Sequence, residues 1–295
     1  MSIKRLKKEI FYLRKAFFEY GNGFAYLYKK YFLAQKIYHK HSIEKPVNNH
    51  NLSLHVLTGK SDFTMLLWSL HSFYQQMSEI GQLYIHNDGT LTPRNFGLLK
   101  KYLPSAKIVQ PDDVLRLIEK HEVIQRFRTQ FPKYFLLKKI IDTFFISDAS
   151  MHLIIDSDLY WFAQPTELEQ EIKNGAAHSL AMKNSTPCYV YFKGSTLSED
   201  KAMVNTGVVL YRKDNFNLQK LSEYLNSIDT TNEKNDHFIE QAGFASVLEN
   251  LHILPESRYH IKGMVSSETV VRHYTSPRRL LFFTEALPIA IKNFF

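Results

Sequence analysis

Two periodicities of apolar positions divide the chain. In the first 40 residues apolar side chains recur every three or four positions, which predicts helices over residues 3–20 and 27–38, separated by Gly21-Asn22-Gly23. Residues 39–51 are polar and contain Pro46, so we expect a linker there. After this linker, short apolar runs alternate with helix-period segments, which indicates βαβ units.

The order of these segments predicts an α/β fold. Strands are expected at residues 54–58, 82–86, 106–109, 152–155 and 270–274, and helices at residues 63–77, 93–102, 132–146, 218–227 and 237–249. Strands connected through helices favour a mostly parallel sheet with helices on its faces, and the closer-spaced strands between residues 179 and 211 favour a mixed extension of that sheet.

Charge separates the same two parts, a helical hairpin over residues 1–45 and a body over residues 46–295. The formal charge of the chain is +8. Residues 1–45 hold 11 Lys and Arg against 3 Asp and Glu, and the body holds 26 of each kind, so the excess charge belongs to the hairpin. A neutral body does not indicate nucleic-acid binding, because attraction to phosphates needs a positive surface.

The hairpin has two interpretations. It packs on its own body or on another subunit, or it attaches to an anionic membrane surface, for which basic and interfacial aromatic residues are suited. No apolar run reaches the length of a membrane span, and no cleavable signal-peptide pattern follows the basic start. The single cysteine, Cys188, rules out an intramolecular disulfide and favours a reducing compartment. We therefore expect a cytoplasmic protein, with peripheral contact at the inner face of a membrane as the second interpretation.

The most informative chemistry follows the apolar strand at residues 152–155. Asp156 and Asp158 lie one residue apart, so in an extended segment both carboxylates point the same way. Paired carboxylates suit Mg²⁺ or Mn²⁺, although an Asp-Ser-Asp triplet also begins many solvated turns. His273 ends a later strand and is a candidate third ligand, and Arg278 and Arg279 are suited to phosphate oxygens.

These segments together resemble the GT-A fold glycosyltransferases, in particular those related to glycogenin and to bacterial lipopolysaccharide galactosyl- and glucosyltransferases. The resemblance covers about residues 52–285 and leaves the hairpin outside it. The motifs that carry it are Thr58-Gly59, Lys139-Ile140-Ile141-Asp142, Asp156-Ser157-Asp158, Asn205-Thr206-Gly207, Glu240-Gln241 and His273-Tyr274-Thr275-Ser276-Pro277.

The resemblance implies a Rossmann-like, mostly parallel sheet and a set of functional residues. It implies Mn²⁺ or Mg²⁺ on Asp156, Asp158 and His273, and places Glu240 and Gln241 at the reacting sugar. The implied donor-binding residues are Thr58, Gly59, Asp62, Lys139, Asp142, Ser157, Asn205, Gly207 and Arg279. The implied donor is a nucleotide-diphosphate sugar, with UDP favoured. The implied acceptor is a sugar, a lipid-linked molecule or a protein, and the implied outcome is retention of the anomeric configuration.

Three positions depart from the pattern of these relatives. Asp62-Phe63 is shifted from the usual Asp and Tyr beside the base, Glu240 replaces an Asp, and Arg279 replaces a Lys. Two other functions remain compatible with the sequence: a metal-dependent phosphatase or nucleotidyltransferase that uses the same aspartates, and a non-catalytic adaptor at a membrane surface.

Overall fold

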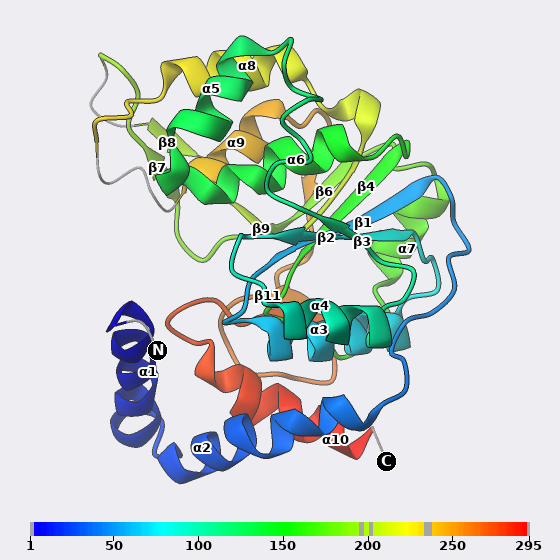
Figure 1. The fold of residues 1–295 in the computed structure, drawn as a ribbon, viewed down its shortest axis with the longest axis vertical. Helices are drawn as coiled ribbons and strands as arrows, with labels where there is room; N and C mark the ends of the chain where they lie inside the picture. Colours follow the sequence, from blue (N-terminus) through cyan, green and yellow to red (C-terminus); the bar gives the residue numbers. More distant parts are fainter. Residues whose placement is uncertain (1–2, 195–197, 201–202, 233–237, 294–295) are drawn as a thin grey trace.

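A mixed, mostly parallel sheet forms the centre of the molecule (Figure 1). The computed structural model describes residues 3–194, 198–200, 203–232 and 238–293. The sheet has the strand order β10-β6-β9-β4-β1-β2-β3. Its strands are β1 (Leu52–Thr58), β2 (Gln82–Asn87), β3 (Lys107–Val109), β4 (Met151–Asp156), β6 (Ser179–Lys183), β9 (Val204–Arg212) and β10 (Leu251–Ile253). Only β9 runs antiparallel to its neighbours, β4 and β6, so the predicted fold class is confirmed.

Helices cover both faces of this sheet (Figure 1). One face carries α5 (Glu122–Gln130), α6 (Lys138–Ile146), α8 (Leu218–Ser227) and α9 (Ile239–Val247), and the other carries α3 (Phe63–Gln76) and α4 (Pro93–Tyr102). Side chains of β4 alternate between the two cores: Leu153 and Ile155 pack on the α3 side, and Ile154 packs on the α6 side. Burial on both faces explains why Leu153, Ile154 and Ile155 form a continuous apolar run.

Two smaller sheets lie beside the central one. In the first, β12 (Val271–His273) pairs antiparallel with β5 (Leu159–Trp161) and parallel with β11 (Tyr259–His260). The second joins β7 (Cys188–Val190) to β8 (Ser198–Asp200). The β5–β12 pairing brings a C-terminal segment to the end of β4, where the predicted metal ligands lie.

The N-terminal segment is helical, as predicted, with α1 (Ile3–Arg14) continuing as a π-helical turn (Lys15–Glu19), then α2 (Gly23–Tyr31) and a 3₁₀ helix (Leu33–His39). In Figure 1, α2 runs next to the C-terminal α10 (Leu287–Lys292). Ala34 and Ile37 are buried in the same core as α3, and the Trp68 indole donates a hydrogen bond to the Ala34 carbonyl at 2.9 Å. This part of the segment therefore packs on the body.

The predicted apolar stripe of the first helix consists of Ile3, Leu6, Ile10, Leu13 and Phe17, and it faces the body only in part. Leu13 packs against the core, whereas Leu6, Ile10 and Phe17 are exposed. Tyr12 and Ala16, which lie outside the stripe, are buried. The three- and four-residue spacing correctly identified a helix face, but it did not identify which of these side chains the body covers. Of the helices in the described part of the chain, none combines the length and apolar composition that a bilayer span requires.

Most predicted elements lie within a few residues of the observed ones. The helix predicted over residues 132–146 begins as a 3₁₀ helix (Pro132–Leu137), and α6 itself starts at Lys138 because Tyr134 has non-helical backbone angles. The sequence analysis did not predict α5, α7 (Thr166–Lys173) or α10. The start predicted for the helix at residue 237 lies outside the described residues, and α9 begins at Ile239.

Candidate functional site

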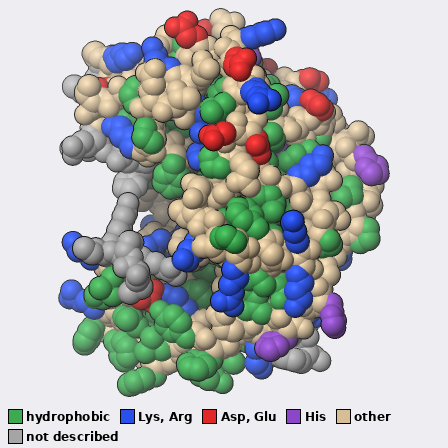
Figure 2. All heavy atoms as spheres, viewed as in Figure 1, with side chains coloured by type: hydrophobic (Ala, Val, Ile, Leu, Met, Phe, Trp, Pro, Cys, Tyr) green, Lys and Arg blue, Asp and Glu red, His purple; other side chains and the backbone are tan. Residues whose placement is uncertain are grey.

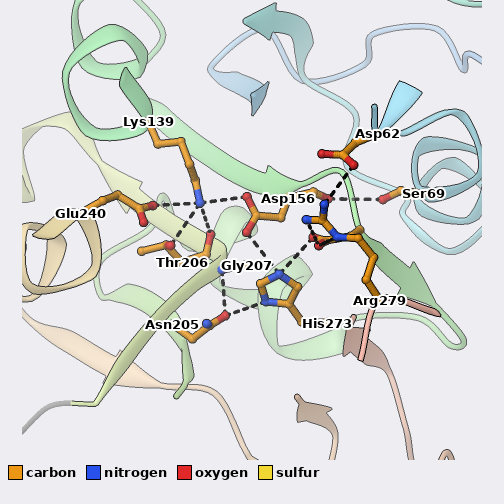
Figure 3. A network of polar contacts seen from close by, with 11 residues as sticks. Asp62, Ser69, Lys139, Asp156, Asn205, Thr206, Gly207, Glu240, His273 and Arg279 are labelled. Carbon is orange, nitrogen blue, oxygen red and sulfur yellow. Dashed lines mark hydrogen bonds and ion pairs between the residues drawn. The ribbon is translucent and has the colours of Figure 1, made fainter. Parts of the chain in front are cut away.

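The candidate site lies at the end of β4, where backbone pairing joins two distant segments (Figure 3). Asp156 is the last residue of β4, and Asp158 immediately precedes β5. His273 ends β12, and its register partner on β5 is Leu159. The Tyr274 amide also donates a hydrogen bond to the Asp158 carbonyl at 2.9 Å. The antiparallel pairing thus places His273 opposite Leu159, the residue that follows Asp158, so that its imidazole lies next to the second aspartate.

The three predicted metal ligands converge. His273 Nε2 lies 3.1 Å from Asp158 Oδ1 and 3.3 Å from Asp156 Oδ2. One candidate ligand atom from each of the three residues lies within 4.8 Å of the other two. Two carboxylates and an imidazole form a donor set that suits Mn²⁺, which is bound by both oxygen and nitrogen ligands. Mg²⁺ prefers oxygen ligands, which the two carboxylates supply.

Asn205 and Gly207 of β9 fix the orientation of His273. His273 Nδ1 lies 2.8 Å from Asn205 Oδ1, which also accepts the Gly207 N–H at 3.0 Å. A Cβ atom on Gly207 would lie 2.4 Å from His273 Nδ1, so only glycine allows the ring this close. Because Nδ1 donates to Asn205, Nε2 is left to face the aspartates, which is the usual orientation of a metal-binding imidazole.

Lys139 of α6 connects Asp156 to Glu240 of α9. Its Nζ lies 2.8 Å from Asp156 Oδ1 and 2.8 Å from Glu240 Oε1, and it donates to the Thr206 carbonyl at 3.0 Å and to the Thr206 hydroxyl at 3.1 Å. Burial alone would lower the pKa of Lys139, but the two carboxylates more than compensate and raise it. Lys139 therefore stays charged and holds both acids in place.

Arg279 connects Asp158 to Asp62, which lies just before α3. Arg279 donates to Asp158 Oδ2 from Nη2 at 2.6 Å and from Nε at 3.0 Å, and to Asp62 Oδ1 from Nη1 at 2.9 Å. Burial would raise the pKa of Asp158, but the Arg279 and His273 charges hold it well below its usual range. The Arg279 guanidinium thus pairs with one oxygen of each carboxylate and joins Asp62 to Asp158.

The protonation of His273 follows from these neighbours. Burial alone would lower the pKa of His273, yet Asp158 and Asp156 raise it to about 9. With His273 protonated, the network holds three positive side chains: Lys139, His273 and Arg279. They contact four acidic side chains, Asp62, Asp156, Asp158 and Glu240, and burial raises the pKa of Glu240. The imidazolium proton thus supplies positive charge at the point where a divalent cation fits.

Other predicted donor-binding residues also lie at this edge of the sheet. Thr58 ends β1, and its buried hydroxyl has no hydrogen-bond partner among the described residues. Gly59 follows it, and a Cβ atom there would lie 2.0 Å from the Asp88 carboxylate, so the position requires glycine. Ser157 is buried between the two aspartates.

Two predicted residues have other partners. The Asp142 carboxylate is buried and accepts hydrogen bonds from Arg128 Nε at 2.8 Å and Nη2 at 3.0 Å. The Gln241 amide oxygen accepts a hydrogen bond from Asn184 Nδ2 at 3.0 Å. Asp142 therefore anchors α6 to α5, and Gln241 is linked to Asn184, the residue that follows β6.

Thr206 is the network residue that the sequence analysis missed. It lies between Asn205 and Gly207 on β9, so its side chain points to the opposite face of the strand from theirs. That face is the one covered by α6, where Lys139 lies. The alternation of side chains along the strand is the signal that could have identified it.

Comparisons with known proteins identify the fold. No protein-family model and no curated protein sequence matches the chain. Among solved structures, the bifunctional glycosyltransferase WbbM aligns with a TM-score of 0.53 and 10% identity over 85% of this chain and 52% of its own. The galactosyltransferase LgtC, in complex with donor and acceptor sugar analogues, aligns with a TM-score of 0.50 and 12% identity over 80% of this chain and 95% of its own. Mouse xyloside xylosyltransferase 1 has a TM-score of 0.49 at 12% identity, over 79% of this chain and 99% of its own.

At these identities the likeness establishes the fold, which is that of GT-A glycosyltransferases. The resemblance drawn from the sequence motifs is confirmed at that level. The WbbM alignment spans only about half of that protein, and the LgtC alignment spans nearly all of its counterpart.

Proposed function

We propose that the protein is a metal-dependent glycosyltransferase that moves a sugar from a nucleotide-diphosphate sugar, with UDP as the favoured nucleotide, to a sugar, lipid-linked or protein acceptor. The observation that carries the proposal is the convergence of Asp156, Asp158 and His273, beside Arg279, on a GT-A fold. A divalent cation and a guanidinium at one place are suited to a diphosphate leaving group.

The residues present fit Mn²⁺ or Mg²⁺. Asp156, Asp158 and His273 would hold the ion, and Asn205 already orients the imidazole toward it. When bound, such an ion supplies Lewis-acid stabilisation of a departing diphosphate. The aspartates are ionised in the folded protein, because Lys139, Arg279 and His273 outweigh the effect of burial on their pKa values and keep them low.

The remaining groups have proposed roles around the sugar. Arg279 binds diphosphate oxygens, and Lys139 keeps Asp156 charged and holds both Asp156 and Glu240 in position. Glu240 and Gln241 contact the donor sugar near its anomeric carbon. In the overall reaction the bond from that carbon to the diphosphate breaks, a bond to an acceptor oxygen forms, and the acceptor proton is released. We propose retention of configuration, by analogy with the resembled family.

Thermal-shift measurements with nucleotides test the proposal. UDP or GDP with Mn²⁺ should raise the melting temperature of the wild type, because a ligand that binds only the folded state stabilises it. Asp158→Ala should abolish the increase. Hydrolysis of UDP-sugars in a Mn²⁺-containing screen would then identify the donor. Phosphomonoester hydrolysis without sugar transfer would favour the phosphatase, and no response to any nucleotide would favour the adaptor.

We also propose that the protein contacts an anionic membrane surface through α1 and α2. Among the described residues, nine of the fourteen exposed large apolar side chains lie between residues 6 and 32, including Phe18 at 86% and Phe24 at 81% exposure. Figure 2 shows hydrophobic side chains gathered at the lower left, over α1 and α2, with Lys and Arg among them. Apolar side chains in a positively charged segment match the chemistry of an anionic lipid surface.

Vesicle sedimentation tests this contact. The wild type should sediment with vesicles that contain phosphatidylglycerol and much less with phosphatidylcholine vesicles. The double variant Phe18→Ser, Phe24→Ser should lose most of this binding, whereas Phe135→Ser should keep it, because Phe135 is exposed but lies outside the N-terminal segment. Equal binding by the double variant and the wild type would contradict the proposal.

A further inference from the structure

A cavity of about 200 Å³ lies between the N-terminal helices and the candidate site. Its walls come from α1, α2, the loop between β1 and α3, and the segment after β12. Asp62 and Arg279 belong both to this cavity and to the candidate site, where Arg279 pairs with Asp158. The cavity therefore adjoins the carboxylates that are proposed to hold the metal.

Specific contacts hold α1 at the edge of this cavity. The buried Tyr12 donates a hydrogen bond to the Ser276 hydroxyl at 3.3 Å, and Ser276 belongs to the motif that begins with His273. Glu9 accepts hydrogen bonds from Lys30 at 2.7 Å and from Tyr31 at 2.9 Å. The charge of Glu9 is thus compensated within the hairpin and does not oppose an anion in the cavity.

Lys8 brings a second cation to the same cavity. It lines the cavity with Arg279, and its charge interacts with those of Arg279, Asp62 and Asp158. Burial and the positive charge of Arg279 lower the pKa of Lys8. Asp62 and Asp158, which already pair with Arg279, act on Lys8 in the opposite direction. Within the described ranges Lys8 forms no ion pair, so its ammonium group can pair with an anion bound in the cavity.

The aromatic walls complete the description of the ligand. Tyr12, Tyr26 and Tyr31 line the cavity together with Lys8 and Arg279. Tyr12 and Tyr26 are buried, whereas Tyr31 is exposed and offers a ring face on which a nucleobase can stack. Phosphate oxygens are recognised by Lys and Arg. A cavity that combines both features is suited to a nucleotide.

We propose that α1 forms one wall of the donor site, with Lys8 binding a phosphate oxygen of the nucleoside diphosphate and Tyr12 lining the space for its nucleoside. This inference rests on the proposed glycosyltransferase function and assigns a role to a helix that lies outside the part of the chain resembling the family. Lys8 is a positioning residue for the diphosphate, opposite Arg279.

Calorimetric titration of UDP and GDP into the full chain with saturating Mn²⁺ tests the inference. With whichever nucleotide binds the wild type more tightly, Lys8→Ala should weaken binding about tenfold, since a hydrogen bond to a charged group is lost. Lys8→Arg should recover most of the affinity. The matched control is Lys7→Ala, because Lys7 is the neighbouring cation and lines a different groove, on the other side of α1. It should stay within about twofold of the wild type.

Salt dependence separates a phosphate contact from a change in folding. The gap between Lys8→Ala and the wild type should shrink at high ionic strength, because added salt screens the lost interaction. If the wild type binds nucleotide but Lys8→Ala and Lys7→Ala bind alike, this inference alone is overturned. If the wild type binds neither UDP nor GDP with Mn²⁺, the proposed function falls and the inference falls with it.

Discussion

Lowering the pH from about 7.5 to about 5.5 should destabilise the folded protein by about 4 kcal/mol, because three histidines are buried without charge in the central sheet. The rings of Tyr84, His55, His152 and Tyr211 stack in a row across β2, β1, β4 and β9, with centroids 5.0, 5.4 and 5.0 Å apart. His86 Nε2 lies 3.0 Å from His55 Nδ1. Within the described part of the chain the hydrogen-bond partners of these imidazoles are serine and other histidines and include no carboxylate, so protonation inside the fold is unfavourable.

The magnitude follows from the difference in proton affinity between the folded and unfolded states. Burial, with a contribution from nearby positive charges, lowers the pKa of His86 and of His152 to about 3, and burial lowers the pKa of His55 well below its usual value. In the unfolded chain each imidazole has a pKa of about 6.5. Their stabilising contribution is therefore complete above about pH 6.5 and is lost as the pH falls toward about 3, at about 1.4 kcal/mol for each histidine by pH 5.5.

The contributions of His71 and His273 to the pH dependence of stability have opposite signs and cancel. Burial lowers the pKa of His71 to about 4, so His71 adds a similar loss. The pKa of His273 is raised to about 9, so its contribution is complete below about pH 6.5, is lost as the pH rises through about 9, and grows when the pH falls from 7.5 to 5.5. The net change is that of the three sheet histidines, about 4 kcal/mol, which is a large part of the roughly 5–15 kcal/mol that stabilises a typical folded protein.

Urea denaturation at the two pH values measures this change directly. His152→Phe keeps a ring in the row but removes one titrating group, so its loss should be smaller than that of the wild type by about 1.4 kcal/mol. Tyr211→Phe is the matched control, since it alters the neighbouring ring of the same row without changing titration in this range. The reasoning is refuted if the wild type is equally stable at both pH values, or if His152→Phe loses as much stability as the wild type.

Three further predictions concern the candidate site. Lys139→Met should lower the free energy of unfolding by about 3–5 kcal/mol in urea denaturation, because it leaves Asp156 and Glu240 buried without their cation; a loss below about 1 kcal/mol would contradict the pairing. Gly207→Ala should weaken Mn²⁺ binding by about tenfold or more in calorimetry, because its Cβ atom would displace the His273 ring, and unchanged affinity would contradict this orientation. Mn²⁺ affinity should rise about tenfold from about pH 7 to about pH 8, with one proton released, because the pKa of His273 is about 9; a flat profile would exclude His273 as a ligand.

Local patterns were sufficient to predict most of the architecture. Continuous apolar strands such as residues 152–155 and helix-period segments such as residues 63–77 depend on which faces are buried, and burial on fixed faces imprints a period on the sequence. The same logic had a limit at the first helix. The stripe of Leu6, Ile10 and Phe17 is a genuine helix face, but the period does not say whether that face meets the body or the solvent.

The residues of the candidate site were predictable to a similar degree. The Asp156 and Asp158 pair is visible in the sequence, because two carboxylates after a buried strand need a counter-charge. Their connection to Lys139, Glu240 and Arg279 depends on side chains that meet across α6, α9 and the C-terminal segment. The number of residues between two elements does not determine how far apart they lie in the fold, so these ion pairs could not be derived from the sequence spacing.

The sequence by itself determined the alternation of strands and helices, the positive N-terminal segment and the types of residue available for metal and phosphate chemistry, since these depend on local composition and period. The tertiary structure alone decided that β12 pairs with β5 and brings His273 to the aspartates, that Gly207 makes room for its ring, and that α1 closes a cavity beside Arg279. Such contacts join residues far apart in the sequence, 115 positions in the case of Asp158 and His273, and only the free energy of packing the whole chain selects them.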